Sequence, residues 1–290
     1  MTKKPATGGR KLDPGLQRKL DALEAQLRRL GKVLVAYSGG VDSTLLLKAA
    51  SDVLGPNVLP VVAGSETYPT REVDAALRLA RKLGLRPRFI KTCELENPKF
   101  TANTPERCYF CKKELFGRLK AVARKEGIPY VLDGANSDDR LDFRPGGRAG
   151  RELGIRSPLK DAGLTKDEIR ALSRHFRLPT WDKPSLACLA SRFPYGSRIE
   201  PRGLGQVGRA EDVLRRLGFG QLRVRHHGSI ARIEVEAGDF PKVLKPAIRQ
   251  RIVRDLKKLG YLYVTFDLEG YRTGSLNEAL GKRAPRRAAK

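Results

Sequence analysis

Six residues near the N-terminus, Ser-Gly-Gly-Val-Asp-Ser at 38–43, have the types and order of a phosphate-binding loop. Two adjacent glycines let the backbone approach a phosphate, and the hydroxyls of Ser38 and Ser43 add hydrogen-bond donors. The helix expected to follow would present unpaired N–H groups and its positive dipole end to an anion. Asp42 repels a phosphate, so we expect it to act through Mg²⁺. No Gly-Lys-Ser/Thr follows, so the loop is not of the Walker type.

Three cysteines have a spacing that suits metal or redox chemistry. Cys108 and Cys111 form a C-x₂-C pair, and Cys188 follows later in the chain. Three thiolates can hold three irons of a [4Fe–4S] cluster. Spacing alone leaves two alternatives, a redox dithiol of the close pair and a zinc site completed by a histidine. The candidate histidines are His175, His226 and His227. Cys93 has no partner at a useful spacing, which predicts a small buried apolar residue.

The composition predicts an anionic partner. The 290 residues include 58 Lys+Arg and 32 Asp+Glu, a formal net charge of +26 at pH 7. Nucleotides, phosphorylated metabolites and nucleic acid all suit such a charge. No apolar run approaches the roughly 18 residues of a membrane span, and no signal-peptide pattern precedes the loop. We therefore expect a cytoplasmic protein with reduced cysteines and no membrane partner.

Hydrophobic spacing predicts the elements that position these residues. Strands are expected at 33–37, 58–63, 88–91 and 130–133, and helices at 14–30, from about 45, at 71–83 and at 112–125. Their alternation predicts an α/β fold with a doubly wound parallel sheet, which binds ligands at the carboxyl ends of its strands. The phosphate loop would lie at that edge.

The pattern changes in the second half of the chain. It predicts helices at 166–176, 210–217 and 240–259, strands at 222–226, 231–236 and 262–267, and a proline-rich stretch at 178–202. We therefore expect a loop-containing domain at 14–180 and a smaller C-terminal α/β domain at 181–277. The ends, 1–13 and 278–290, are basic, poor in large apolar residues, and expected to be disordered arms.

Several motifs together resemble the LarE family of ATP-dependent sulfur transferases, within the PP-loop ATP pyrophosphatase superfamily. The resemblance extends from about residue 16 to 277. It rests on loop 38–43, Arg-Cys-Tyr-Phe-Cys-Lys at 107–112, Asp-Gly-Ala-Asn-Ser-Asp-Asp at 133–139 and Ala-Cys-Leu-Ala-Ser-Arg at 187–192.

This resemblance implies that ATP adenylates the carboxylates of pyridinium-3,5-biscarboxylate mononucleotide, and that sulfur then displaces AMP to give thiocarboxylates. The product leads to the nickel-pincer nucleotide cofactor of lactate racemase, so the implied partners are a sulfide source and a nickel-inserting enzyme. A homo-oligomer is also implied. The implied ATP-binding residues are Ala36, Ser38, Gly39, Gly40, Asp42, Ser43, Ser65 and Gly134, with Asp42 also binding Mg²⁺.

The cysteines distinguish two forms of the family. In one, a single cysteine at the position of Cys188 gives up its sulfur and becomes dehydroalanine. The presence of Cys108 and Cys111 favours the three-cysteine variant, in which all three thiolates hold a [4Fe–4S] cluster. The open iron would then carry the sulfide, and the enzyme would turn over repeatedly.

The expected substrate residues are basic, with one acid among them. Arg223 and Arg225 alternate on a predicted strand, so both point to one face and could bind a phosphate bidentately. The alternative is a pair of surface arginines on an edge strand. Arg192 is a catalytic candidate for the AMP or substrate phosphate, and Glu211 is a substrate candidate or a helix-dipole partner. Two aromatic residues, Trp181 and Tyr195, either stack on the pyridinium ring or anchor the loop around Cys188.

A tRNA-thiolating enzyme is the main alternative. Some such enzymes combine the same loop with three cysteines and a cluster, and the net charge of +26 suits RNA. No RNA-binding module is recognisable, however, and the segments around Cys188 and Arg223 match the sulfur transferases better. Nucleic acid is therefore not the expected partner.

Overall fold

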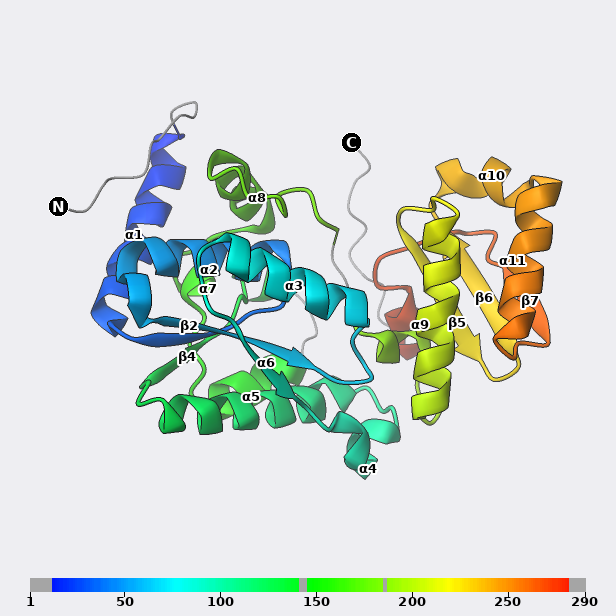
Figure 1. Cartoon of the computed structure of the whole chain (residues 1–290), viewed down its shortest axis with the longest axis horizontal. Helices are drawn as coiled ribbons and strands as arrows, with labels where there is room; N and C mark the ends of the chain where they lie inside the picture. The colour runs from blue at the N-terminus through cyan, green and yellow to red at the C-terminus, as the bar shows by residue number, and fades with distance from the viewer. Residues whose placement is uncertain (1–11, 141–144, 185–186, 282–290) are drawn as a thin grey trace. The chain divides into compact units, whose positions relative to one another are not determined.

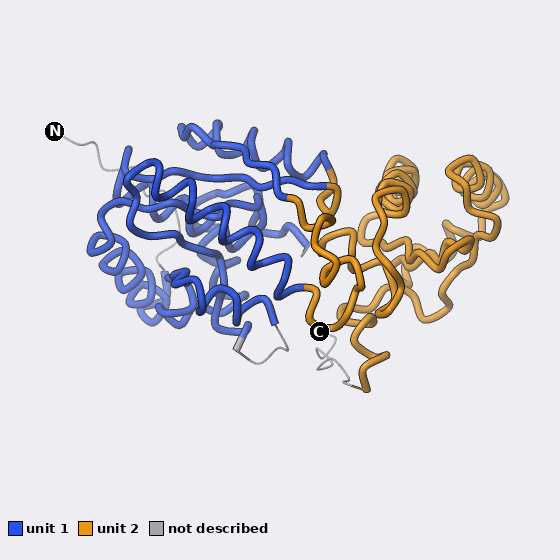
Figure 2. Tube along the Cα trace, turned by 90° about the horizontal axis from the view of Figure 1, so that it is seen from below, with its two compact units in different colours: residues 1–65, 70–92, 108–186 blue, residues 66–69, 93–107, 187–290 orange. Residues whose placement is uncertain are grey.

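The computed structural model describes residues 12–140, 145–184 and 187–281. The chain divides into two compact units, each gathered from three separate segments (Figure 2). Unit 1 comprises residues 1–65, 70–92 and 108–186, and unit 2 comprises 66–69, 93–107 and 187–290. The predicted domains, 14–180 and 181–277, were each one continuous stretch. The structure differs by an exchange of segments, in which residues 66–69 and 93–107 belong to unit 2.

Unit 1 is built on a parallel sheet of four strands in the order β3-β2-β1-β4. The strands are β1 (Val33–Ala36), β2 (Val58–Gly64), β3 (Arg88–Lys91) and β4 (Tyr130–Leu132). Strand β1 pairs with β2 on one side and with β4 on the other, so the strand order reverses beside β1. Doubly wound sheets bind ligands at such a switch point. The expected α/β fold is confirmed.

Helices cover both faces of this sheet (Figure 1). Helices α1, α2, α3 and α8 pack on one face around Leu23, Leu45 and Leu172, and α5 packs on the other through Phe116. The bounds in unit 1 are α1 (Pro14–Leu30), α2 (Val41–Leu54), α3 (Thr70–Lys82), α5 (Arg107–Lys125), α6 (Pro145–Glu152), α7 (Pro158–Asp161) and α8 (Lys166–His175).

Helix α5 begins at Arg107 rather than at residue 112, so Cys108 and Cys111 lie in its first two turns. The residues of these turns include Cys, Tyr and Phe, which are weak helix formers, so propensity did not reveal the earlier start. Packing supports it: a Cβ added to Gly146 of α6 would lie 3.3 Å from the carbonyl oxygen of Cys108.

Unit 2 contains a three-stranded sheet in the order β5-β6-β7. Its elements are α4 (Pro98–Thr101), α9 (Pro201–Arg216), β5 (Leu222–His227), β6 (Ile230–Val235), α10 (Phe240–Leu244), α11 (Pro246–Lys258) and β7 (Tyr263–Phe266). Strand β5 is antiparallel to β6, and β6 is parallel to β7. Helices α9 and α11 pack on one face through Leu214 and Leu256.

Two helices of unit 2 differ from expectation. Helix α9 starts at Pro201 instead of residue 210, because glycines at 203, 205 and 208 hide its periodicity. The helix expected at 240–259 is broken at Lys245, since the proline that follows cannot continue a helix. The first difference arises from glycines, which have no side chain, and the second from a proline, which has no backbone N–H.

Parts of the expected basic arms are ordered. The carboxylate of Asp13 caps α1, accepting from the N–H of Gly15 at 2.8 Å and that of Leu16 at 3.2 Å. Glu278 belongs to a 3₁₀ turn and pairs with Arg272 at 3.1 Å. The rest of both arms, 1–11 and 282–290, lies outside the described residues. A membrane-spanning helix is not found within the described part of the chain.

Candidate functional site

Loop 38–43 leaves β1 and enters α2 at the carboxyl edge of the unit 1 sheet. Gly40 is the N-cap of α2, and no side chain caps this helix. The first N–H groups of the helix are therefore not used by a side chain and suit an anion. The hydroxyl oxygens of Ser38 and Ser43 lie 3.1 Å apart, which braces the two ends of the loop against each other.

Two glycines are required by close contacts around the loop. Gly39 has φ +68°, and a Cβ on it would lie 2.8 Å from the Cβ of Ala76 in α3. Gly134 follows β4, and a Cβ there would lie 3.0 Å from the backbone nitrogen of Ser43. The structure thus places the segments after β1 and β4 side by side. Ala36 ends β1 and Ser65 directly follows β2, so both lie at the same edge of the sheet.

Asp42 is held by two side chains. The Nζ atom of Lys166 lies 2.5 Å from its Oδ2, and the amide of Asn136 donates to its Oδ1 at 3.2 Å. Asn136 also accepts from the N–H of Asp138 at 3.0 Å, so segment 136–139 forms the turn that its sequence suggests. Its link to Asp42 and the role of Lys166 were missed, because only the fold brings these residues together.

Lys183 ties the loop to α3. Its Nζ donates to the carbonyl oxygen of Gly39 at 3.0 Å and lies 3.0 Å from a carboxylate oxygen of Glu72. Sequence reasoning missed this lysine as well. The available signal was its position, five residues before Cys188. With Lys166, it places two cations beside loop 38–43.

Arg192 and Glu211 bind each other in the interior of unit 2. The Nε and Nη2 atoms of Arg192 donate to the two carboxylate oxygens of Glu211 at 2.7 and 3.0 Å, and the side chains are only 1% and 0% exposed. Burial raises the pKa of Glu211, but the charge and hydrogen bonds of Arg192, with a smaller contribution from Arg215, lower it to about 2. Glu211 is therefore a buried carboxylate anion.

The same guanidinium holds the segment around Cys188. Its Nη1 donates to the carbonyl oxygens of Ala187 and Cys188 at 2.9 and 3.1 Å, and to the hydroxyl of Ser191 at 2.9 Å. Every nitrogen of Arg192 thus has a partner within the protein. The structure shows Arg192 positioning the cysteine segment.

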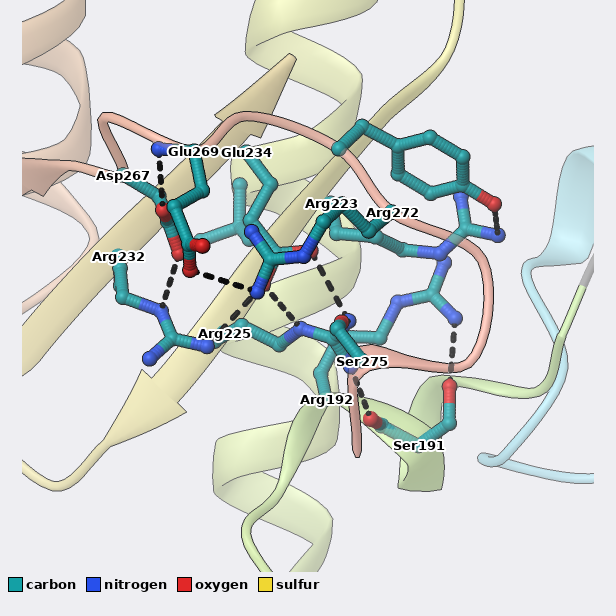
Figure 3. Close-up of polar contacts among 12 residues, drawn as sticks. Ser191, Arg192, Arg223, Arg225, Arg232, Glu234, Asp267, Glu269, Arg272 and Ser275 are labelled. Carbon is teal, nitrogen blue, oxygen red and sulfur yellow. Dashed lines mark hydrogen bonds and ion pairs between the residues drawn. The ribbon is translucent and has the colours of Figure 1, made fainter. Parts of the chain in front are cut away.

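Arg225 is also paired, as Figure 3 shows. It donates to both carboxylate oxygens of Glu234 at 2.8 and 2.9 Å, to the carbonyl oxygen of Ser191 at 2.7 Å and to the hydroxyl of Ser275 at 2.8 Å. Sequence reasoning missed Glu234, although it lies on the neighbouring strand. Arg225 therefore joins β5 and β6 to the segment that follows Cys188.

Arg223 lies on the same face of β5 but has no carboxylate partner among the described residues. It is 4% exposed, so it is not a surface arginine. It donates to the carbonyl oxygen of Leu222 at 2.7 Å and to the hydroxyl of Tyr271 at 3.3 Å. Its hydrogen bonds within the described residues go to these two oxygens and not to a carboxylate. Burial, followed by the charge of Arg192, lowers its pKa to about 10, and the charges of Tyr271 and Glu211 offset this only in part. A buried cation that is not bonded to a carboxylate suits an anionic ligand.

The three cysteines of interest belong to different units. Cys108 and Cys111 lie one turn apart on α5 of unit 1, and Cys188 begins a 3₁₀ turn in unit 2. All four cysteines are thiols, and Cys93 is half-buried. Within the described ranges, no three His, Cys, Asp or Glu side chains gather as a metal site.

The two aromatic candidates contact arginines. The guanidinium of Arg174 lies 4.2 Å from the ring centre of Trp181, and that of Arg107 lies 4.9 Å from the ring centre of Tyr195. The hydroxyl of Tyr195 also donates to Asn277 at 3.0 Å. These contacts are of the kind that anchors a loop.

No family model matches the chain. It is 42% identical over 271 residues to pyridinium-3,5-bisthiocarboxylic acid mononucleotide synthase of Lactiplantibacillus plantarum, a match covering 92% of this chain and 96% of the relative. It is 45% identical over 267 residues to an uncharacterized protein of Synechocystis sp., covering 92% and 100%. A more distant relative is a glutamine-hydrolyzing GMP synthase component of Thermoplasma volcanium, 28% identical over 64% of this chain and 61% of the relative.

The sequence identity and the loop geometry together indicate the family to which the chain belongs. The match to the synthase spans almost the whole of both chains, and the distant match to a GMP synthase fits the phosphate loop at the switch point of the sheet. The chain therefore belongs to the LarE family of ATP-dependent sulfur transferases, within the PP-loop superfamily.

Proposed function

We propose that this protein uses ATP to adenylate the carboxylates of pyridinium-3,5-biscarboxylic acid mononucleotide and then replaces oxygen by sulfur. The observation that carries the proposal is the 42% identity, over 92% of the chain, to a synthase named for the bisthiocarboxylic product. The chemistry agrees with the residues present. A carboxylate oxygen is a poor leaving group until it is joined to AMP, and a PP-loop is a site for the ATP that supplies it.

In this proposal, loop 38–43 binds the phosphates of ATP through the N–H groups at the start of α2. A substrate carboxylate oxygen forms a bond to the α-phosphorus, the bond to the β-phosphate oxygen breaks, and pyrophosphate leaves. Lys166 and Lys183 provide positive charge beside the loop. Asp42 would hold Mg²⁺, an oxygen-seeking cation that would replace Lys166 at its carboxylate.

Arg223 is the proposed site for the substrate phosphate. It is the buried guanidinium of this face that lacks a carboxylate partner among the described residues, whereas Arg225 is paired with Glu234. Arg225 would then hold the segment after Cys188 through the carbonyl oxygen of Ser191. Arg192, itself held by Glu211, would hold the segment around Cys188. An incoming phosphate would supply the missing counter-ion.

Cys108, Cys111 and Cys188 are the proposed ligands of a [4Fe–4S] cluster. The first two fit this role because residues three apart on a helix lie on one face, so both thiolates can reach one cluster. When bound, the cluster would supply the sulfide that attacks the adenylate, with AMP as the leaving group. Cys188 would then act as a ligand. In the alternative form, Cys188 itself donates its sulfur.

The test is anaerobic reconstitution of the full chain with iron and sulfide, followed by ATP and the biscarboxylate mononucleotide. AMP, thiocarboxylate product and the intact mass of the protein are measured together. We expect more than one product molecule per protein chain, an unchanged protein mass and a cluster absorption band. Cys108→Ser and Cys111→Ser should abolish the band, whereas the matched control Cys93→Ser should retain it.

Two other results would separate the parts of this proposal. One product per protein chain, with loss of the mass of hydrogen sulfide from Cys188, would refute the cluster and leave the sulfur transfer intact. Failure to form AMP from ATP with this substrate would refute the function itself. Thiolation of tRNA in place of the mononucleotide would identify the alternative enzyme.

A further inference from the structure

A pocket of about 230 Å³ lies at the start of α9 in unit 2. Its lining includes Phe193, Arg202, Gly203, Gln206 and His226. Side chains alternate along a strand, so His226 points to the opposite face of β5 from Arg223 and Arg225. The pocket is therefore separate from the arginine cluster to which the proposed function assigns the substrate phosphate.

The first turn of α9 supplies backbone donors to this pocket. The helix has 16 residues, its N-cap is Glu200, and no side chain caps it. Because Pro201 has no N–H, the leading donors are the N–H groups of Arg202 and Gly203. These groups and the positive dipole end favour an anion.

Gln206 is an independent indication that something binds here. It is only 8% exposed and lines the pocket, yet its amide has no hydrogen bond to any residue that the structure describes. Its Nε2 faces Gly260, another lining residue, because a Cβ on that glycine would lie 3.3 Å from it. The amide atoms themselves are not fully buried, so they open onto the pocket, where they can hydrogen-bond to a ligand.

His226 adds a further polar atom. Its Nδ1 lies 3.1 Å from the hydroxyl of Tyr261, which leaves Nε2 for the pocket. A Cβ on Gly203 would lie 3.4 Å from this Nε2, so the ring reaches the first turn of α9. The imidazole packs against the ring of Phe193, with ring centres 4.8 Å apart, which holds the imidazole in place.

The charged residues of the pocket are mostly basic. Arg198 and Arg202 are exposed at its rim, and Glu200 is the acidic residue among the lining residues. The net charge of these three side chains is positive, in addition to the helix dipole. The volume of about 230 Å³ is below the roughly 300–1,000 Å³ of pockets for drug-sized ligands.

We propose that this pocket binds a phosphate group. The group would accept hydrogen bonds from the first turn of α9, Gln206 and His226, with Arg202 closing over it from the rim. The volume suits inorganic phosphate, or the phosphate end of a phosphomonoester whose remainder extends out of the open pocket. The proposal does not depend on the proposed sulfur transfer, because no residue is shared.

The three histidines of the chain make a direct test possible. Imidazole NMR signals of the full chain would be recorded at constant pH during titration with inorganic phosphate, and assigned with His226→Gln. We expect the His226 signal to shift and saturate, while that of His175, in unit 1, stays in place. The same titration with ribose 5-phosphate identifies the source: tighter binding indicates a phosphomonoester, and weaker binding indicates the free ion.

Two arginines on α9 provide a matched comparison. Arg202→Gln removes a rim charge and should weaken phosphate binding about tenfold, as expected for one charge-assisted contact. Arg209→Gln removes the same charge from the same helix outside the pocket lining and should change the affinity less than about twofold. Equal losses in the two variants would overturn the proposal, because they would indicate diffuse attraction to a basic surface.

Gln206→Glu keeps the size of the side chain and places a negative charge in the pocket. Saturation of the His226 signal should then disappear, while circular dichroism shows that the fold is retained. If this variant does not fold, the arginine comparison decides alone. A His226 signal that never saturates in the unmodified protein would also refute the site.

Discussion

Replacing Glu211 by Gln tests how the segment around Cys188 is held. The Glu211 carboxylate is fully buried and accepts hydrogen bonds from Arg192, from Arg215 and from the N–H of Val224. A glutamine of the same shape keeps part of this network but removes the charge, so the Arg192 guanidinium stays buried without its counter-ion. Breaking a buried pair in this way costs roughly 3–5 kcal/mol.

The pKa of Glu211 gives a second value for the same interaction. Its pKa is about 2 in the folded protein, against a usual 4.5. Such a difference corresponds to about 3 kcal/mol of stabilisation, in the range expected from the broken pair. Because the folded-state pKa is lowered, this stabilisation is present above the unfolded-state pKa and is lost as the pH falls toward about 2. The stabilities of the protein and of Glu211→Gln should therefore converge in acid.

Urea unfolding followed by two signals is the assay. Trp181 is the single tryptophan of the chain and lies in unit 1, so its emission follows that unit, whereas circular dichroism follows both. With a slope of about 2 kcal/mol per molar urea, a loss of about 3 kcal/mol lowers a midpoint by about 1.5 M. We expect this displacement in the circular dichroism of Glu211→Gln but not in the tryptophan transition.

The control removes both partners. Arg192→Met combined with Glu211→Leu removes both charges of the pair, so neither is left buried without the other, and this variant should be more stable than Glu211→Gln alone. The reasoning is refuted if the single variant unfolds within about 0.3 M urea of the unmodified protein. It is equally refuted if the double variant is the less stable of the two.

Three further predictions concern loop 38–43 and the arginines of β5. Gly39→Ala should lower AMP formation more than about tenfold with circular dichroism unchanged, since φ is +68° and the new methyl would meet Ala76; near-normal rates would contradict this. Lys183→Met should raise the KM for ATP several-fold, because the loop loses its tie to α3, and an unchanged KM would assign the lysine a purely structural role. Arg223→Met should raise the substrate KM about tenfold without lowering the melting temperature. Arg225→Met should lower the melting temperature, because it leaves the buried carboxylate of Glu234 with only the exposed Arg232 as an ion-pair partner among the described residues. Equal melting temperatures of the two variants would show that the pairing of Arg225 with Glu234 is unimportant.

Local spacing predicted much of the fold, and it failed where a residue type hides or breaks the pattern. The strands of unit 1 and helix α1 follow short apolar runs and a three-to-four periodicity, which a sequence displays directly. The glycines of α9 leave no apolar stripe at its start, and the aromatic start of α5 has weak helix propensity.

The candidate site also contains residues that the sequence alone predicts and residues that only the fold reveals. Loop 38–43 is a contiguous motif, so its place at the switch point could be predicted. Lys166 and Lys183 reach that loop from distant segments, and only the packed fold reveals them. Arg192 was predicted to contact a phosphate, and Glu211 to contact the substrate or to act on a helix dipole; the structure adds that the two side chains bind each other. A sequence displays charge types without showing which charges pair.

The exchange of segments between the units has a consequence for synthesis of the chain. Asn103 is buried, and its amide donates to the carbonyl oxygens of Pro194 and Ser197 at 2.7 and 3.0 Å. Those carbonyls leave the ribosome about 90 residues later, a delay of roughly 5–20 s at usual elongation rates. Segment 93–107, with its buried Phe100, waits through that interval for residues 187–290. The demand for chaperones during synthesis would therefore depend on how fast the last third of the chain is translated.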